Sequence, residues 1–154
     1  MGMKRGVIAI DETEAHETLL REAGQWAAAA DAKLVVLTFL DESEYEKGVE
    51  TLESVGKVEN VSYDTGAVTE AAADDAAAFA AGVLDGMGVE FTTVAAVVGD
   101  KERGSRVVEA GEKYDCDHAF VVGTGRSPTG KALFGDFAQQ VILNFGGLVT
   151  ITME

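Results

Sequence analysis

The chain has 154 residues, of which 47% are hydrophobic, with a single cysteine and a formal net charge of −15 from 27 acidic and 12 basic residues. This length and apolar content predict one globular domain over residues 1–154, with no internal disulfide. The acidic balance argues against a nucleic-acid binder, which needs a basic surface, and no apolar run is long enough to span a membrane.

The chain opens with a predicted strand, helix and strand. Residues 4–10 form a short apolar run with β-branched residues, which predicts a buried strand. Apolar residues then recur at helical spacing over 13–31, with Thr13 as the expected N-cap. Residues 32–40 are a second apolar run, of the kind that is buried on both faces in a parallel sheet.

The segment after this second strand is the least decided part of the chain. Residues 43–55 allow a short acidic helix, and residues 56–68 read as a loop. A long helix is predicted over about 69–86, and Gly86 and Gly88 are expected to end it.

The second half of the chain continues the alternation. Strands are predicted at 89–98, 118–123 and 148–153, and helices at 103–115 and from about residue 136 to residue 145. Strands that alternate with helices imply β-α-β units, and therefore a mainly parallel sheet with helices on both faces. Ligands of such sheets lie beyond the carboxyl ends of the strands, where the strand order reverses.

The stretch that follows the fourth strand, VVGTGRSPTGKALFGDF at 121–137, is the candidate functional site. A strand that feeds a Gly-rich loop and then a helix suits a phosphate, because glycines let the backbone approach and the helix start favours an anion. Asp11, which ends the first strand, is expected on the same edge. Six of the 12 basic residues lie between 101 and 131, among them Arg103 and Arg106. This local reversal of charge indicates either an anion site or scattered surface charge.

This stretch and the order of the elements resemble the universal stress protein family, over essentially the whole chain. Nucleotide-binding members of that family carry Gly, two residues, Gly, nine residues, Gly, and then Ser or Thr. Here Gly123 is followed by Arg126 at the place of the second glycine, and nine residues separate Gly125 from Gly135. Asp136 then takes the place of the Ser or Thr.

The resemblance implies a flavodoxin-like α/β sandwich with a five-stranded parallel sheet in the order 3-2-1-4-5. It implies a homodimer through the last strand, and ATP or another adenine nucleotide as the ligand of a stress-response sensor or switch. The residues that it places at the nucleotide are Asp11, Thr38, Phe39, Val122, Gly123, Gly125, Arg126, Ser127, Lys131, Gly135, Asp136 and Phe137.

Position 136 departs from the family pattern, because a carboxylate accepts hydrogen bonds where a hydroxyl would donate one to a phosphate. At about 4 Å and an effective dielectric constant of about 20, its repulsion of one phosphate charge would cost roughly 4 kcal/mol. There are three ways to accommodate this carboxylate. Arg126 and Lys131 could offset the repulsion, or Asp136 could hold a Mg²⁺ ion that bridges to the phosphates. Alternatively, Asp136 could serve as the N-cap of the helix. The alternative is a family member that binds no nucleotide and acts as a homodimeric protein-interaction module.

Three other motifs have weaker support. GRSPTGKA at 125–132 nearly matches a P-loop, but Ala132 lacks the hydroxyl that holds Mg²⁺. Asp100 is poor support for the phosphorylated aspartate of a receiver domain, and Cys116 and His118 are too few ligands for a closed zinc site. No general base or arginine finger can be assigned, so we expect no catalytic residue and at most slow ATP hydrolysis.

The N-terminal segment has neither the long apolar region nor the small-residue cleavage site of a signal peptide, so we expect a cytoplasmic protein. Its acidic residues are spread along the whole chain. Such a surface suits a cytoplasm of very high salt, because the Debye length falls to about 3 Å at 1 M and self-repulsion is screened. The composition, and the string RSPTGKALFG, therefore favour a halophilic, haloarchaeal-like member of the family, with an ordinary acidic protein as the alternative.

Overall fold

A parallel sheet of five strands forms the centre of the protein, in a computed structural model that describes residues 4–11, 13–59, 66–123 and 134–153. The strand order is β3-β2-β1-β4-β5, and every neighbouring pair is parallel. Both the α/β class and the order 3-2-1-4-5 are confirmed. The strands are β1 (Arg5–Ile10), β2 (Lys33–Leu40), β3 (Phe91–Val97), β4 (His118–Gly123) and β5 (Leu148–Met153).

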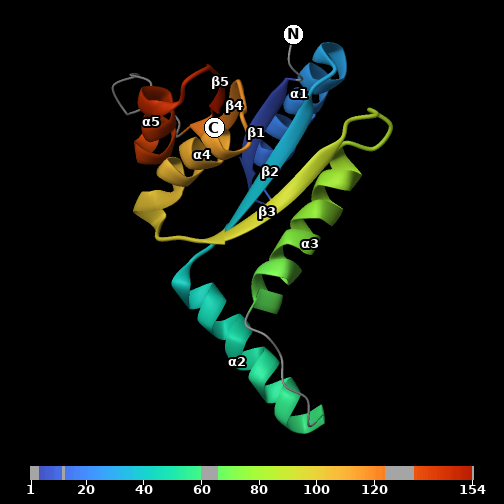
Figure 1. Cartoon of the computed structure of the whole chain (residues 1–154), viewed down its shortest axis with the longest axis vertical. Coiled ribbons are helices and arrows are strands. Elements are labelled where there is room, and N and C mark those ends of the chain that lie inside the picture. The colour runs from blue at the N-terminus through green and yellow to red at the C-terminus, as the bar shows by residue number, and fades with distance from the viewer. Residues whose placement is uncertain (1–3, 12, 60–65, 124–133, 154) are drawn as a thin grey trace.

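Helices cover the two faces of the sheet in pairs (Figure 1): α1 and α3 pack on one face, and α4 and α5 on the other. A short 3₁₀ turn, η1 (Asp100–Glu102), precedes α4. No helix among the described residues is long and apolar enough to cross a membrane. The helices are α1 (Glu14–Ala30), α2 (Glu42–Glu59), α3 (Gly66–Val83), α4 (Arg103–Lys113) and α5 (Gly135–Asn144).

The central strands are buried on both sides, which explains their continuous apolar runs. Successive residues of a strand point to opposite faces. In β1, Ile8 and Ile10 therefore join the core under α1 and α3, while Val7 and Ala9 join the core under α4 and α5. All four side chains are at most 6% exposed.

The predicted ends of two helices are confirmed. Thr13 caps α1, since its hydroxyl accepts a hydrogen bond from the His16 backbone N–H at 3.2 Å. After α3 the chain turns through Gly86 and Gly88, whose φ values of +79° and +70° lie in the left-handed region that favours glycine.

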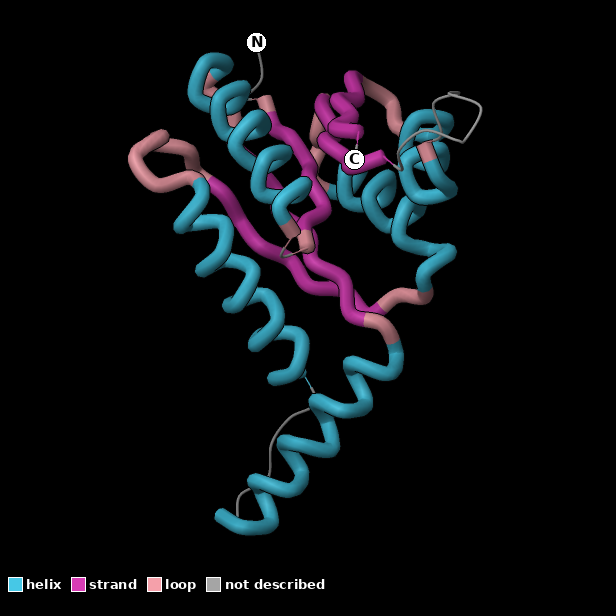
Figure 2. Tube along the Cα trace, turned by 180° about the vertical axis from the view of Figure 1, so that it is seen from behind, coloured by secondary structure: helices cyan, strands magenta, loops and turns pink. Residues whose placement is uncertain are grey.

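The segment between β2 and α3 differs from its prediction. The acidic helix α2 continues to Glu59, and α3 begins at Gly66, so much of the expected loop over 56–68 is helical. α2 leaves the end of β2 and projects away from the sheet (Figures 1 and 2). Near its start it passes close to α3, where a Cβ on Gly48 would come within 2.7 Å of Val68. Its Glu, Lys and Leu residues favour a helix. The side chains described near its start are exposed or only partly buried.

Candidate functional site

A cavity of about 310 Å³ opens at the carboxyl ends of β1 and β4. These strands are neighbours at the centre of the sheet, and the chain crosses over to opposite sides of them. That reversal separates the loops that follow the two strands and leaves a crevice between them. The described residues that line the cavity are Ala9, Ile10, Asp11, His16, Phe39, Glu44, Arg103, Val122, Gly123 and Phe137.

Gly123 ends β4 at the floor of this cavity. A Cβ at this position would lie 2.9 Å from the Met153 sulfur and 3.0 Å from a methyl carbon of Ile151. A larger residue here would therefore displace the Met153 side chain, so packing against β5 favours a glycine whatever ligand the cavity takes.

Charged groups of both signs face the cavity. Arg103, at the start of α4, holds its guanidinium over the ring of Phe39, 5.7 Å from the ring centroid. The carboxylates of Asp11 and Glu44 line the same space. Desolvation raises the pKa of Glu44, the nearby Asp41 and Asp11 carboxylates raise it further, and Arg103 opposes them. The described lining thus combines a guanidinium with the carboxylates of Asp11 and Glu44.

Most of the predicted contact residues that the structure describes gather at this cavity. Thr38 instead lines an adjoining hollow of about 220 Å³, which shares Asp11 and Phe39 with it. The predicted Gly125, Arg126, Ser127 and Lys131 lie outside the described residues. The predicted residues that line the cavity are Asp11, Phe39, Val122, Gly123 and Phe137.

The helix α5 begins at Gly135, whose φ is +77°. The residue before it, Phe134, caps the helix without a side-chain hydrogen bond, and Asp136 lies in the first turn. The expectation that Asp136 serves as the N-cap is therefore wrong, because the helix starts one residue earlier. Asp136 lines a separate surface hollow of about 410 Å³ together with Lys101.

Sequence reasoning missed three residues of the cavity or left them undecided. Glu44 fell in the undecided segment after β2, where no local pattern indicated a site. His16 was not a candidate, yet it lines the cavity from α1. Arg103 was a candidate through the cluster of basic residues and through its place, with Arg106, at the start of the helix on the ligand edge. Neither feature separated Arg103 from Arg106.

Cys116 and His118, which were considered as zinc ligands, lie just before and at the start of β4. His118 is 8% exposed, its ring stacks on Phe120 with 4.2 Å between centroids, and its Nε2 lies 2.7 Å from the Thr150 hydroxyl. Within the described parts of the chain, no group of three or more His, Cys, Asp or Glu residues is arranged to hold a metal ion.

Comparisons with known proteins agree with this architecture. No curated protein matches the chain. A universal stress protein from Archaeoglobus fulgidus is similar in structure, with a TM-score of 0.65 and 22% identity over 98% of each chain. A structure of the universal stress protein from Archaeoglobus fulgidus in complex with dAMP has a TM-score of 0.61 and 18% identity over 98% of each chain.

A further universal stress protein, solved in complex with cAMP, has a TM-score of 0.63 and 18% identity, over 99% of this chain and 98% of its own. These structures support the fold. The sequence profile of the Universal stress protein family matches residues 3–151, nearly the whole chain. The chain therefore belongs to the universal stress protein family.

Proposed function

We propose that this chain binds an adenine nucleotide, ATP or AMP, in the cavity between Asp11 and Gly123. In this proposal it acts as a homodimeric sensor or switch of a stress response in a cytoplasm of high salt. The observation that carries the proposal is the meeting of Asp11, Arg103 and Gly123 around one cavity at the point where the strand order reverses.

The chemistry of the cavity fits a nucleotide. Its volume of about 310 Å³ is at the lower end of the about 300–1,000 Å³ that small-molecule sites occupy. The Asp11 carboxylate would accept hydrogen bonds from ribose hydroxyls, and the Phe39 ring would lie against the base. The Arg103 guanidinium and the backbone N–H groups at the start of α5 would favour the phosphates.

The position of Asp136 reduces the expected repulsion between its carboxylate and a bound phosphate. It lines the hollow shared with Lys101 and is absent from the described lining of the cavity, so its charge is directed to solvent. For the same reason, the proposal does not include Asp136 as a Mg²⁺ ligand. Any Mg²⁺ would enter with the nucleotide, bound to its phosphates.

The neighbours support adenine as the base. Two structures that share the fold were solved with dAMP and with cAMP, and both ligands combine adenine with a single phosphate. At 18% sequence identity, the ligand contacts in these structures cannot be transferred to individual residues of this chain. The proposal for this chain therefore depends on its cavity.

Calorimetric titration of ATP with Mg²⁺ in molar KCl tests the proposal. We expect binding by the native protein and by Asp136→Ser, about tenfold weaker binding by Asp11→Ala because a charged hydrogen-bond acceptor is lost, and no change in Asp74→Ala. Asp74 is an exposed carboxylate on α3 that does not line the cavity. Absence of binding by the native protein, or binding by Asp136→Ser alone, would overturn the proposal and leave the homodimeric interaction module.

A further inference from the structure

A second cavity lies beside α4, on the face of β2 and β3 that α4 and α5 cover only in part. The crossovers into β4 and β5 carry α4 and α5 toward β1 and β4, on which these helices pack. The same face of β2 and β3 is therefore only partly covered. The groove that remains has a volume of about 130 Å³, and Leu37, Phe39, Val94 and Ala96 form its apolar floor.

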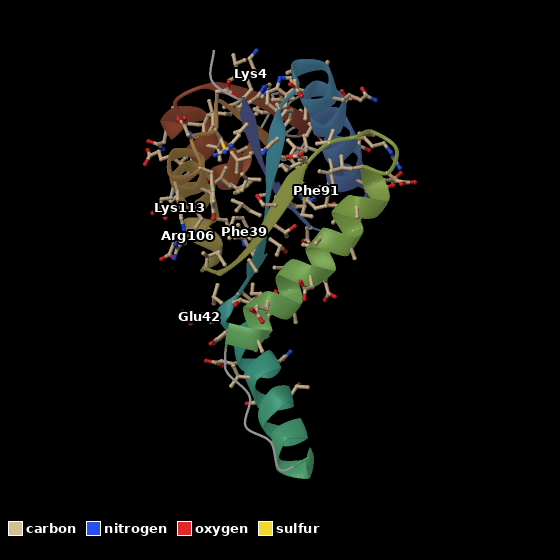
Figure 3. All side chains as sticks on the ribbon, turned by 45° about the vertical axis from the view of Figure 1, so that its right-hand side comes forward. Lys4, Phe39, Glu42, Phe91, Arg106 and Lys113 are labelled. Atoms are coloured by element: carbon tan, nitrogen blue, oxygen red, sulfur yellow. The ribbon has the colours of Figure 1, made fainter. Side chains whose placement is uncertain are left out.

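Cationic side chains of α4 border this apolar floor. Arg106 and Lys113 are two helical turns apart, so they lie on the same side of the helix. Both extend from α4 on the side of the molecule where Phe39 lies (Figure 3). Tyr114 lines the groove as well, and the Lys113 ammonium lies 5.4 Å from the centroid of its ring. Two cations beside one apolar groove stand out on a chain with a net charge of −15.

One carboxylate shares this border. The Arg106 Nη1 lies 3.4 Å from a Glu109 carboxylate oxygen, and both side chains are exposed. An exposed pair at this distance is weak, so Glu109 leaves most of the donor capacity of Arg106 available to a second acceptor. The border of the groove keeps an excess of one positive charge.

The shape and charge of the groove together specify its ligand. A volume of about 130 Å³ is close to the about 150 Å³ of a protein cavity that takes up benzene. We propose that this groove binds a small aromatic monocarboxylate. The ring would lie on the floor between Phe39 and Ala96, and the carboxylate would accept hydrogen bonds from Arg106 and Lys113. This site is distinct from the proposed nucleotide cavity, although Phe39 borders both.

Benzoate is the probe that tests this proposal, with the full chain in two-dimensional NMR titrations. We expect a dissociation constant on the order of 1 mM, as suits so small a ligand, with shifts at Val94, Ala96 and Ala110. Benzyl alcohol has the same ring without the charge and should bind at least about tenfold more weakly. Equal affinities for the two ligands, or shifts confined to other parts of the sheet, would overturn the proposal.

Variants separate the contribution of charge from that of shape. Arg106→Gln and Lys113→Gln should each weaken benzoate binding about three- to tenfold, and Glu109→Gln should strengthen it, because a competing carboxylate is removed. The matched control is Arg21→Gln on α1: Arg21 is exposed and paired with Glu17 at 2.7 Å, and it does not line the groove. The same weakening in Arg21→Gln, or no strengthening in Glu109→Gln, would contradict the charged contact.

Ala96→Leu tests the floor without changing any charge. The larger side chain would occupy the groove, so benzoate binding should disappear while the amide spectrum of the rest of the sheet is preserved. Unchanged benzoate binding in a folded Ala96→Leu variant would also overturn the proposal.

Discussion

The guanidinium of Arg103 lies over the face of the Phe39 ring, with 5.7 Å between its central carbon and the ring centroid. This contact joins the start of α4 to the end of β2 at the rim of the candidate nucleotide cavity. A cation on an aromatic face stabilises an exposed site by about 0.5–1 kcal/mol. The contact therefore holds a charged group beside the cavity.

The first prediction concerns the charge of Arg103. Arg103→Gln should lower the affinity for AMP about tenfold and change the affinity for adenosine little, because the guanidinium acts on the phosphate. Calorimetry with the two ligands measures the difference. Arg106→Gln is the control, since Arg106 is on the same helix but does not line this cavity. An equal loss for AMP and adenosine would mean that Arg103 supports only the shape of the cavity.

The second prediction concerns the packing of α4 against α5. A Cβ on Gly104 would lie 2.6 Å from the Gln140 Cβ and 2.9 Å from the Phe137 carbonyl oxygen. Gly104→Ala should therefore lower the free energy of unfolding by about 1–3 kcal/mol and displace Phe137 from the cavity. Gly82→Ala in α3 is the control, because a Cβ there meets nothing within 4 Å.

Gly82→Ala should be neutral or should stabilise the protein by about 0.5 kcal/mol, because alanine favours a helix. Urea unfolding of both variants gives the comparison. Similar unfolding midpoints for the two variants would contradict the tight contact between α4 and α5.

The third prediction concerns the buried His118. Desolvation lowers its pKa, while the neighbouring Asp117 acts in the opposite direction. Its ring contacts Trp26 and Phe120, and its Nδ1 is buried without a hydrogen-bond partner among the described residues. A protonated ring would bury an N–H without an acceptor, so the folded state favours the neutral form.

Because the folded pKa is below the ordinary value of about 6.5, the unfolded chain takes up the proton first as the pH falls. The contribution of neutral His118 to stability is therefore complete above about pH 6.5 and is lost as the pH falls toward the folded pKa. The free energy of unfolding should decrease more between pH 7.5 and pH 5 in the native protein than in His118→Asn.

The fourth prediction concerns the apolar surface at the β5 edge. Leu148 on β5 is 67% exposed and Leu143 on α5 is 71% exposed, and an edge strand with such residues favours pairing with a second chain. We expect the native protein to sediment as a dimer and Leu143→Gln/Leu148→Gln to sediment as a monomer. Thr92→Gln on β3, the other edge strand, should remain a dimer. A dimer that resists the double change but is lost in Thr92→Gln would place the interface at β3.

Much of the fold could be predicted from local pattern. The strands at residues 32–40 and 118–123 were evident because both of their faces are buried, which requires continuous apolar runs. Thr13 and Gly86 could be placed because a helix N-cap and a left-handed turn each depend on one residue type. The extent of α2 was not predicted, because Gly56 lowers the helix propensity of the segment that reads as a loop in the sequence.

The candidate site was only partly predictable. Asp11 and Gly123 could be inferred because the loops after the central strands of such a sheet meet at one edge. Glu44 and Arg103 could not be identified as neighbours, since the direction in which each helix leaves the sheet decides whether they meet. The side of α5 on which the Asp136 side chain lies was likewise unpredictable, because it depends on the helix starting at Gly135.

The hydrophobic period of the sequence determined the α/β class with a mainly parallel sheet, because each element type buries apolar residues at its own spacing. The resemblance of the loop and of the element order to the universal stress protein family supplied the family and the order of the strands. The tertiary structure alone decided which charges surround the cavity, that Asp136 lies outside its described lining, and that a second groove is open beside α4. Those properties depend on how the helices are rotated and packed against the sheet, and no short stretch of sequence encodes that packing.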